Sequence, residues 1–220
     1  MTTPKEMQDL VKKQPSNIYG LKWTPTTGNL DTIDHFGEGP NTEQIPSHWS
    51  QLNEESLLSA LSELKNPKLI VEIGVDAPYH GDISLPSSTK TILNWKPDSC
   101  VYIGIDISDK MYLENKEKNI YILQQSSSEK QKVYDKMNEL GLTEIDFMHV
   151  DGYHSIAEVL DEWGYWERMA PFGIMGFHDT NYHPGPIAVL DAADPEIFDV
   201  IYYGREEFDW GFGVVRRKKL

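Results

Sequence analysis

The chain has 220 residues and a mass of 25.2 kDa, and its 39% hydrophobic and 25% charged residues are typical of a soluble protein with a substantial core. The formal net charge of −15 would repel a phosphate backbone, so we expect no nucleic-acid partner. No apolar run approaches the roughly 20 residues of a membrane helix, and the polar start is not a signal peptide. We therefore expect a cytoplasmic protein without a membrane partner.

Residues 1–66 are predicted to form an N-terminal extension. A short helix is expected near residues 5–13, and the glycines and prolines of residues 21–47 argue against regular structure there. From Ser50 onward the leucines follow helical spacing, up to Asn66-Pro67. The extension could be a lid, an interface in a homo-oligomer, or only a wrap around the core.

Residues 67–220 alternate near-continuous apolar runs with amphipathic helices. The predicted strands are residues 69–75, 101–106, 119–123, 145–150, 173–177, 198–203 and 211–215. The predicted helices are residues 88–95, 128–140, 156–166 and 186–193. Such apolar runs indicate strands buried on both faces, so the pattern predicts an α/β fold with a mostly parallel sheet between helices.

Two further features have simple interpretations. Cys100 is the only cysteine, which excludes an internal disulfide and a cysteine-based metal cluster, and its apolar surroundings indicate a small buried residue. The only dense basic run, Arg216-Arg217-Lys218-Lys219, is expected to end a strand in solvent.

Acidic residues recur in or directly after the predicted strands. Glu72 lies in the first strand, Asp106 ends the second, and Asp151 follows the fourth in the sequence Asp151-Gly152-Tyr153-His154. A carboxylate at the end of a parallel strand lies at the crevice of an open sheet, where it can accept hydrogen bonds from ribose hydroxyls. Each acid alone would more often cap a helix, but their repetition favours a nucleotide-like ligand.

Four motifs in this order resemble those of class I S-adenosylmethionine-dependent methyltransferases. They are Val71-Glu72-Ile73-Gly74-Val75, Ile103-Gly104-Ile105-Asp106-Ile107-Ser108, Asp146–His154 and Phe177-His178-Asp179-Thr180. The last two are similar to the branch of metal-dependent O-methyltransferases that act on antibiotic and sugar hydroxyls. The resemblance covers residues 67–180 and implies a Rossmann-like, seven-stranded sheet whose last strand is antiparallel.

The resemblance also implies a cofactor site for S-adenosylmethionine. Glu72 and Gly74 would line the methionine end, Asp106 would hold the ribose hydroxyls, Ser127 would lie near the adenine, and Asp151 would border the same pocket. One departure is the segment 76–86, which we interpret as an insertion of about ten residues, because the interval from Glu72 to Asp106 exceeds the roughly 20 residues expected. Its Tyr79, His80 and Asp82 could contact the substrate.

A divalent metal is predicted where two neighbouring strands end. Asp151 and Asp179 offer the oxygen ligands that suit Mg²⁺. His178 could be a third ligand, better suited to Mn²⁺ or Zn²⁺, or only a strand-end residue. His183 on the following loop could contact the substrate or be an ordinary loop residue.

His154 is the candidate general base. A methyl acceptor hydroxyl becomes a nucleophile only as its proton leaves, and a histidine close to a metal can accept that proton. The alternative is a solvent-facing residue in the first turn of a helix. The function that we expect is methyl transfer from S-adenosylmethionine to a small-molecule hydroxyl, in a sugar or secondary metabolite. The rivals are an inactive methyltransferase-like binding module and a metal-dependent hydrolase.

Overall fold

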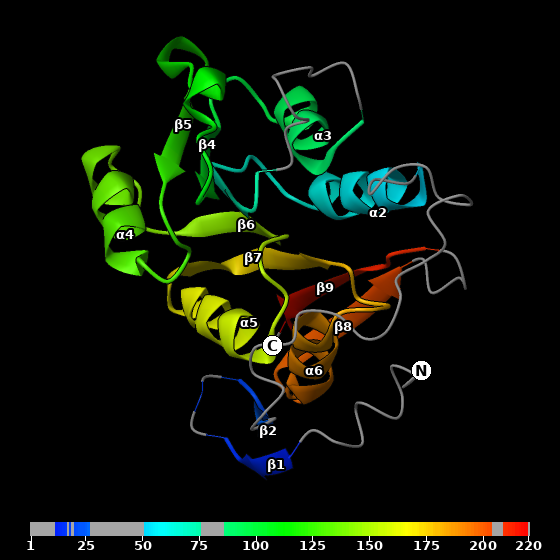
Figure 1. The fold of residues 1–220 in the computed structure, drawn as a ribbon. Coiled ribbons are helices and arrows are strands. Elements are labelled where there is room, and N and C mark those ends of the chain that lie inside the picture. The colour runs from blue at the N-terminus through cyan, green and yellow to red at the C-terminus, as the bar shows by residue number, and fades with distance from the viewer. Residues whose placement is uncertain are drawn as a thin grey trace.

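The computed structural model describes residues 12–16, 18, 20–26, 51–75, 86–203 and 209–219. Its centre is a seven-stranded sheet in the order β5-β4-β3-β6-β7-β9-β8 (Figure 1). The strands are β3 (Leu69–Ile73), β4 (Val101–Asp106), β5 (Ile120–Gln124), β6 (Ile145–Val150), β7 (Met169–His178), β8 (Phe198–Tyr203) and β9 (Phe212–Arg217). Neighbours are parallel except that β9 is antiparallel to both β7 and β8. The predicted α/β class and antiparallel last strand are confirmed.

Helices cover both faces of this sheet (Figure 1). One face carries α2 (Gln51–Ser62) and α3 (Ser88–Trp95), and the other carries α4 (Lys130–Glu139), α5 (Ile156–Trp163) and α6 (Pro184–Ala192). Short 3-10 helices are η3 (Met111–Leu113), η4 (Lys116–Lys118) and η5 (Gly164–Arg168). Within the described ranges, no helix combines the length and the apolar character needed to cross a membrane.

Two hydrophobic cores follow from the alternation of side chains along the strands. Val71 and Ile73 of β3 pack with α4, α5 and α6, whereas Ile70 packs with α2 and α3. The same alternation in β6 places Met148 in the first core and Phe147 in the second. Residues of one strand therefore serve both layers, as expected for a strand buried on both faces.

Within the predicted extension, the structure describes two short strands and the helix α2. Strands β1 (Lys12–Pro15) and β2 (Trp23–Thr26) form a small antiparallel sheet, and β2 contacts α5 and α6. The expected helix over residues 5–13 lies largely outside the described residues, and its positions 12–13 belong to β1. The segment 76–85, with Tyr79, His80 and Asp82, also lies outside them.

Helix α2 belongs to the second core although it precedes residue 67, where we predicted the main domain to begin. Its Leu57, Ala60 and Leu61 are fully buried and share a cluster with Ile70 and Phe147 of the sheet. The predicted boundary therefore falls between two elements that pack on each other.

The order of the strands reverses between β3 and β6. From β3 the chain proceeds through β4 to β5 on one side, whereas β6 leads to β7 on the other. In open α/β sheets, the crevice at the carboxyl ends of the strands at such a point is where ligands bind. This crevice collects the residues that follow β3, β4, β6 and β7.

The basic run ends β9, which is antiparallel to β7, so it lies at the amino ends of the parallel strands, away from the crevice. Arg216 pairs with Glu63 and Asp199, and Lys218 lies 3.9 Å from the same Asp199 carboxylate. The guanidinium of Arg217 lies over the ring of Trp166, 5.8 Å from its centre. Acidic and aromatic side chains of this chain thus engage much of the basic charge.

Leu61→Ala should lower the free energy of unfolding by about 2–5 kcal/mol, because it leaves a cavity in the second core. Leu58→Ala on the same helix is the matched control, since Leu58 is 36% exposed and its truncation should cost about 0.5 kcal/mol. Urea unfolding followed by circular dichroism measures both. Equal effects of the two substitutions would contradict the assignment of α2 to the core of the main domain.

Candidate active site

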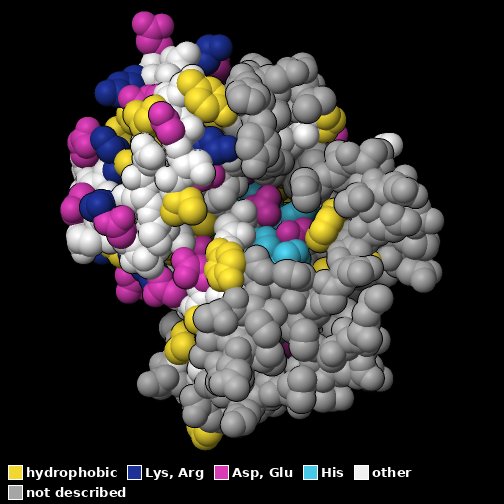
Figure 2. All heavy atoms as spheres, viewed as in Figure 1, with side chains coloured by type: hydrophobic (Ala, Val, Ile, Leu, Met, Phe, Trp, Pro, Cys, Tyr) yellow, Lys and Arg dark blue, Asp and Glu magenta, His cyan; other side chains and the backbone are white. Residues whose placement is uncertain are grey.

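Two aspartates and a histidine meet at the carboxyl ends of β6 and β7. These strands are paired in parallel with His149 opposite Gly176 and Val150 opposite Phe177, so the residues after them emerge side by side. Nδ1 of His178 lies 3.2 Å from Oδ1 of Asp151 and 2.9 Å from Oδ1 of Asp179. The structure therefore brings the three predicted metal ligands together. Figure 2 shows histidine and acidic side chains at the bottom of a hollow on one face of the molecule.

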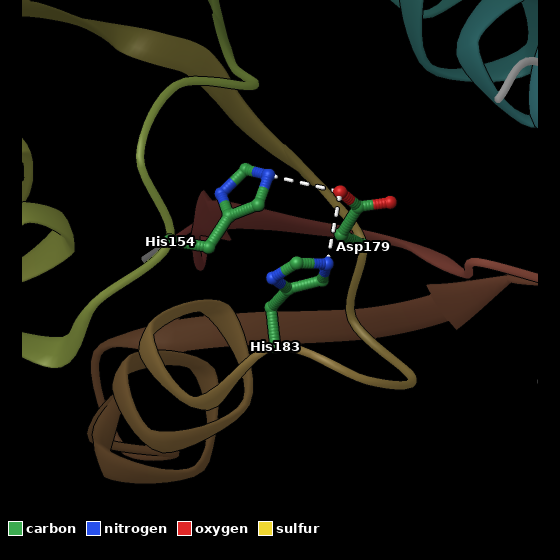
Figure 3. A group of neighbouring side chains, drawn as sticks. All are labelled: His154, Asp179 and His183. Carbon is green, nitrogen blue, oxygen red and sulfur yellow. Dashed lines mark ion pairs between the residues drawn. The ribbon is translucent and has the colours of Figure 1, made fainter. Parts of the chain in front are cut away.

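The second oxygen of Asp179 faces two other histidines (Figure 3). Oδ2 of Asp179 lies 2.9 Å from Nε2 of His154 and 3.4 Å from Nε2 of His183. The two imidazole rings meet edge to face with their centres 4.6 Å apart. His154 is only 5% exposed, so it does not face solvent in the first turn of a helix as the alternative interpretation held.

A sharp turn after β7 aims the Asp179 side chain. Asp179 has a φ of +59°, in the left-handed region that non-glycine residues adopt rarely and aspartate more readily than most. The turn is closed by the amide of His183, which donates to the Asp179 carbonyl over 3.1 Å. Unusual backbone conformations of this kind persist where the surrounding structure holds them, often at functional sites.

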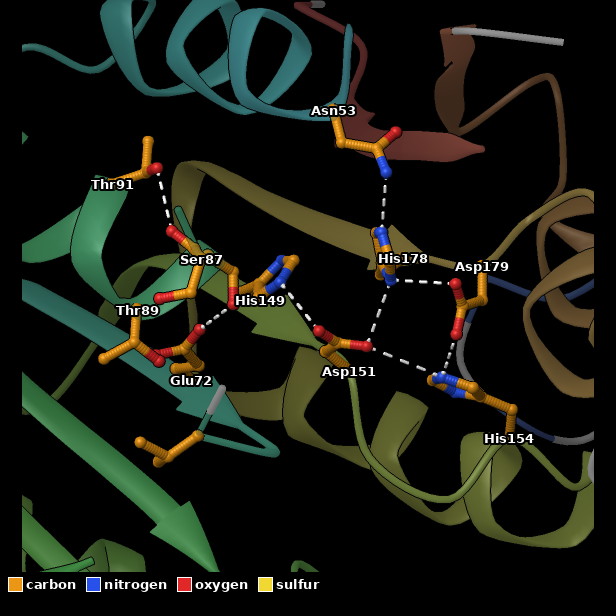
Figure 4. A network of polar contacts seen from close by, with 12 residues as sticks. Asn53, Glu72, Ser87, Thr89, Thr91, His149, Asp151, His154, His178 and Asp179 are labelled. Carbon is orange, nitrogen blue, oxygen red and sulfur yellow. Dashed lines mark hydrogen bonds and ion pairs between the residues drawn. The ribbon is translucent and has the colours of Figure 1, made fainter. Parts of the chain in front are cut away.

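The ring of His178 is oriented by a chain of polar groups that begins outside the sheet (Figure 4). With its amide oxygen toward His178, Asn53 of α2 accepts a hydrogen bond from Nε2 over 2.8 Å. Its amide nitrogen then donates to the Asp209 carboxylate over 3.1 and 3.3 Å. Because Nε2 carries the hydrogen, the lone pair of a neutral His178 is on Nδ1, directed at the two aspartates.

Positive charge is needed between the carboxylates. Burial raises the pKa values of Asp151 and Asp179, but the charge of His178 and the hydrogen bonds from the neighbouring histidines together outweigh burial and hold both pKa values below their ordinary values. Burial lowers the pKa values of the imidazoles, but the two carboxylates outweigh it, so the pKa of His154 rises to about 9 and that of His178 rises well above its ordinary value. Either a proton on the imidazole or a cation satisfies the same demand.

The geometry of Asp151, His178 and Asp179 fits a divalent cation. Their ligand atoms lie within 4.8 Å of one another, which allows one ion to contact all three. Two carboxylate oxygens favour a hard ion such as Mg²⁺, and the imidazole nitrogen also admits Mn²⁺ or Zn²⁺. The hydrogen bond from His178 to Asn53 is the outer contact that orients metal-binding histidines.

Glu72 lies away from this cluster, on the face of the sheet that α2 and α3 cover. Its fully buried carboxylate accepts hydrogen bonds from Ser88 over 2.7 Å, from Thr89 over 2.8 Å, and from the hydroxyl of Tyr102. Burial raises the pKa of Glu72, and His149 and the three hydroxyl groups act in the opposite direction. In this arrangement Glu72 ties α3 to β3 and β4, and its contact with a cofactor stays a prediction.

Gly74 and Asp106 border the crevice on the other side. Gly74 has a φ of +76°, and a Cβ there would collide with the carbonyl of Asp151, so only glycine lets the ends of β3 and β6 approach this closely. Oδ2 of Asp106 accepts from the amide of Val75 over 3.0 Å, and Oδ1 accepts from the amide of Ser108 over 2.7 Å. Each oxygen keeps a second lone pair for a ligand hydroxyl.

Ser127 lies beyond the end of β5 and is 7% exposed. Its hydroxyl lies 2.8 Å from Oε1 of Glu162 and 3.2 Å from Oε1 of Glu158, both on α5. Burial raises the pKa of Glu162 to about 8, and its Oε2 has no hydrogen-bond partner among the described residues. A buried acid of α5 therefore lies next to the Ser127 hydroxyl. The residue before Ser127 in the chain is a serine, Ser126.

Sequence reasoning missed four residues around the cluster. His149 is fully buried on β6, with Nε2 3.8 Å from Oδ2 of Asp151, and its period-two relation to Asp151 was a usable signal. Nε2 of His183 lies 3.4 Å from Oδ2 of Asp179, a contact that the position of His183 on a loop does not predict. Asn53 and Asp209 lie far from the motifs along the chain, and no local pattern marks them.

Comparison with solved structures identifies the fold. MycE, a methyltransferase from the mycinamycin biosynthetic pathway solved with Mg, SAH and mycinamycin VI, is similar with a TM-score of 0.54 and 12% identity, covering 80% of this chain and 53% of MycE. This chain has the class I methyltransferase fold. An O-methyltransferase from Bacillus cereus in complex with SAH gives a TM-score of 0.52 and 15% identity, covering 80% of this chain and 86% of that one.

The likeness to these methyltransferases is one of fold. An rRNA methylase from Streptococcus thermophilus matches with a TM-score of 0.52 and 10% identity, covering 77% of this chain and 98% of that one. This chain spans about half the length of MycE. No protein-family model and no curated protein sequence matches it. The same fold thus occurs in an O-methyltransferase and in an rRNA methylase.

Glu162→Gln should stabilise the protein increasingly as the pH rises. The unfolded carboxyl group ionises near its ordinary value of 4.5, whereas the folded one keeps its proton up to about 8, so wild-type stability falls across this window. Glutamine cannot ionise, so the variant should gain free energy of unfolding relative to wild type across this window. The gain should reach on the order of a few kcal/mol and stay constant at pH values above the folded pKa of about 8.

Urea unfolding at several pH values measures this difference. Glu158→Gln is the control, because it removes a carboxylate that faces the same serine from a less buried position. A difference between Glu162→Gln and wild type that does not change with pH would contradict the buried, protonated state of Glu162.

Proposed function

We propose that this protein transfers a methyl group from S-adenosylmethionine to a hydroxyl group of a small molecule, with the help of a divalent cation. The observation that carries the proposal is the convergence of Asp151, His178, Asp179 and His154 at the crevice of a class I methyltransferase fold. A fold alone would not support it, because sheets of this kind host many chemistries.

The residues divide the crevice into two parts. Asp106, at the end of β4, offers two carboxylate oxygens to the ribose hydroxyls of the cofactor, with Gly74 on the adjacent strand end. Asp151, His178 and Asp179 would hold the cation. The cofactor supplies an activated methyl group on a sulfonium, and the cation lowers the pKa of a hydroxyl bound to it.

When a cation supplies the positive charge between the carboxylates, His154 can be neutral, and it is then placed to accept the acceptor's proton. Its Nε2 lies 2.9 Å from Oδ2 of Asp179 and 3.6 Å from Oδ1 of Asp151, so a hydroxyl held at the cation-binding group would be next to this nitrogen. In methyl transfer the hydroxyl oxygen would gain the methyl group that the sulfonium gives up, and Nε2 of His154 would take the proton that the hydroxyl loses. Asp179 then stabilises the resulting imidazolium.

Two comparisons support a small-molecule acceptor. MycE was solved with Mg, SAH and mycinamycin VI, and the Bacillus cereus protein is an O-methyltransferase. The net charge of −15 disfavours a nucleic-acid acceptor such as that of the rRNA methylase. A hydroxyl of a sugar or a secondary metabolite is therefore the substrate class that we propose.

Asp106→Ala should weaken binding of S-adenosylmethionine at least 10-fold, because the ribose hydroxyls lose their acceptor. Asp109→Ala is the matched control, since the hydrogen bond that Asp109 accepts within the described residues is a local one, from the amide of Met111 on the same loop. Isothermal titration calorimetry with Mg²⁺ present and absent measures both. Failure of the wild-type protein to bind the cofactor in either condition would favour the inactive binding module instead.

His154→Ala should lower turnover by about 10²–10⁴-fold while leaving the affinities for Mg²⁺ and S-adenosylmethionine nearly unchanged. Tyr153→Phe next to His154 is the control, since Tyr153 is 50% exposed. Full turnover of the His154 variant would rule out the base assignment.

Asp179→Ala should remove the dependence on Mg²⁺ together with the activity, because it removes a ligand that the other groups cannot replace.

A further inference from the structure

The two carboxylate oxygens of Asp179 face different histidines. Oδ1 faces Nδ1 of His178, together with Asp151, in the group already described. Oδ2 faces Nε2 of His154 and Nε2 of His183 (Figure 3). A single carboxylate therefore belongs to two groups of three potential ligands, and each group has its ligand atoms within 4.8 Å of one another.

The spacing of the second group matches that of a metal site. For Zn–N distances of about 2.0–2.1 Å, two ligands of a tetrahedral ion are about 3.3 Å apart. The distances from Oδ2 of Asp179 to His154 and His183 are 2.9 and 3.4 Å. Both histidines are largely buried, with 6% and 12% of their side chains exposed, so solvent does not compete strongly for the nitrogens.

The backbone holds the two histidines in place relative to each other. His154 precedes α5, and His183 occupies the position directly before the first residue of α6. The amide of Gly185 donates to the carbonyl of His154 over 2.9 Å, and a Cβ at Gly185 would lie 2.5 Å from the carbonyl of Ser155 and 2.6 Å from that of His154. The start of α6 is thus pressed against the start of α5, which fixes the pair of imidazoles before any ligand arrives.

The geometry points to a second cation site, formed by His154, His183 and Asp179, that shares its carboxylate with the first. The two sites differ in chemistry. The first has two carboxylates and one imidazole and suits hard ions, whereas the second has two imidazoles and one carboxylate and suits Zn²⁺, Co²⁺ or Ni²⁺. Pairs of ions about 3.5–4 Å apart are an established arrangement in metalloenzymes.

An ion in the second site would block methyl transfer. It binds Nε2 of His154, which is the atom that takes the acceptor's proton in the function proposed above. This consequence rests on that proposed function, whereas the existence of the site rests only on the ligand geometry. Zn²⁺ or Co²⁺ would therefore inhibit an enzyme that Mg²⁺ activates, through a site adjacent to the activating one.

Titration of the metal-free full chain with Co²⁺ tests the site. Visible absorption and elemental analysis after gel filtration should give two Co²⁺ ions per wild-type chain and one per chain of His183→Ala or His183→Gln. Tyr182→Phe, which alters the same loop without removing an imidazole, should keep two. An excess of Mg²⁺ should reduce the Co²⁺ content of wild type to one, because Mg²⁺ competes only for the oxygen-rich site.

The outcomes separate the second site from the proposed function. One Co²⁺ per wild-type chain, or two per chain in both folded His183 variants, would overturn the second site whatever the enzyme does. Two ions in wild type and one in the variants support it even if no methyl transfer is found. In the presence of methyl transfer, Zn²⁺ should inhibit wild type at least 10-fold more strongly than His183→Gln.

Discussion

The arrangement of this protein depends on two aspartates that lie at the same edge of one sheet and need positive charge between them. Removing carboxylates from water costs several kcal/mol per ion unless opposite charge compensates it. Here imidazole nitrogens lie 2.9–3.4 Å from the carboxylate of Asp179 on both of its sides. The compensation is therefore mutual, and the loops after β6 and β7 are held by the same charges that give the site its chemistry.

The surrounding elements position these charges. Parallel pairing of β6 with β7 places Asp151 beside His178, and the left-handed turn at Asp179 directs its carboxylate back toward them. Helix α2 adds Asn53, which connects His178 to Asp209 just before β9. Segments that are far apart along the chain thus meet at one imidazole ring. Loss of any of these contacts would change the orientation of the His178 ring as well as the stability of the fold.

The second oxygen of Asp179 lies next to a nitrogen that has two possible roles. Nε2 of His154 faces the aspartates, so the same nitrogen can accept a proton or bind a metal ion. In the two sites that we propose, the choice would depend on the ion, because hard ions prefer the oxygen-rich group and nitrogen-preferring ions favour the imidazole pair. A site of this construction couples metal identity to acid–base chemistry through one shared carboxylate.

The sequence by itself determined the order of strands and helices, the parallel sheet and the predicted metal ligands, because buried strands leave long apolar runs and polar residues follow directly where they end. Only the tertiary structure decided that α2 is part of the core, that Glu72 is tied to three hydroxyl groups, and that His183, Asn53 and Asp209 surround the cluster. These contacts join residues on separate elements. Their geometry depends on how the helices and the loops pack, and periodicity along the chain carries no record of that packing.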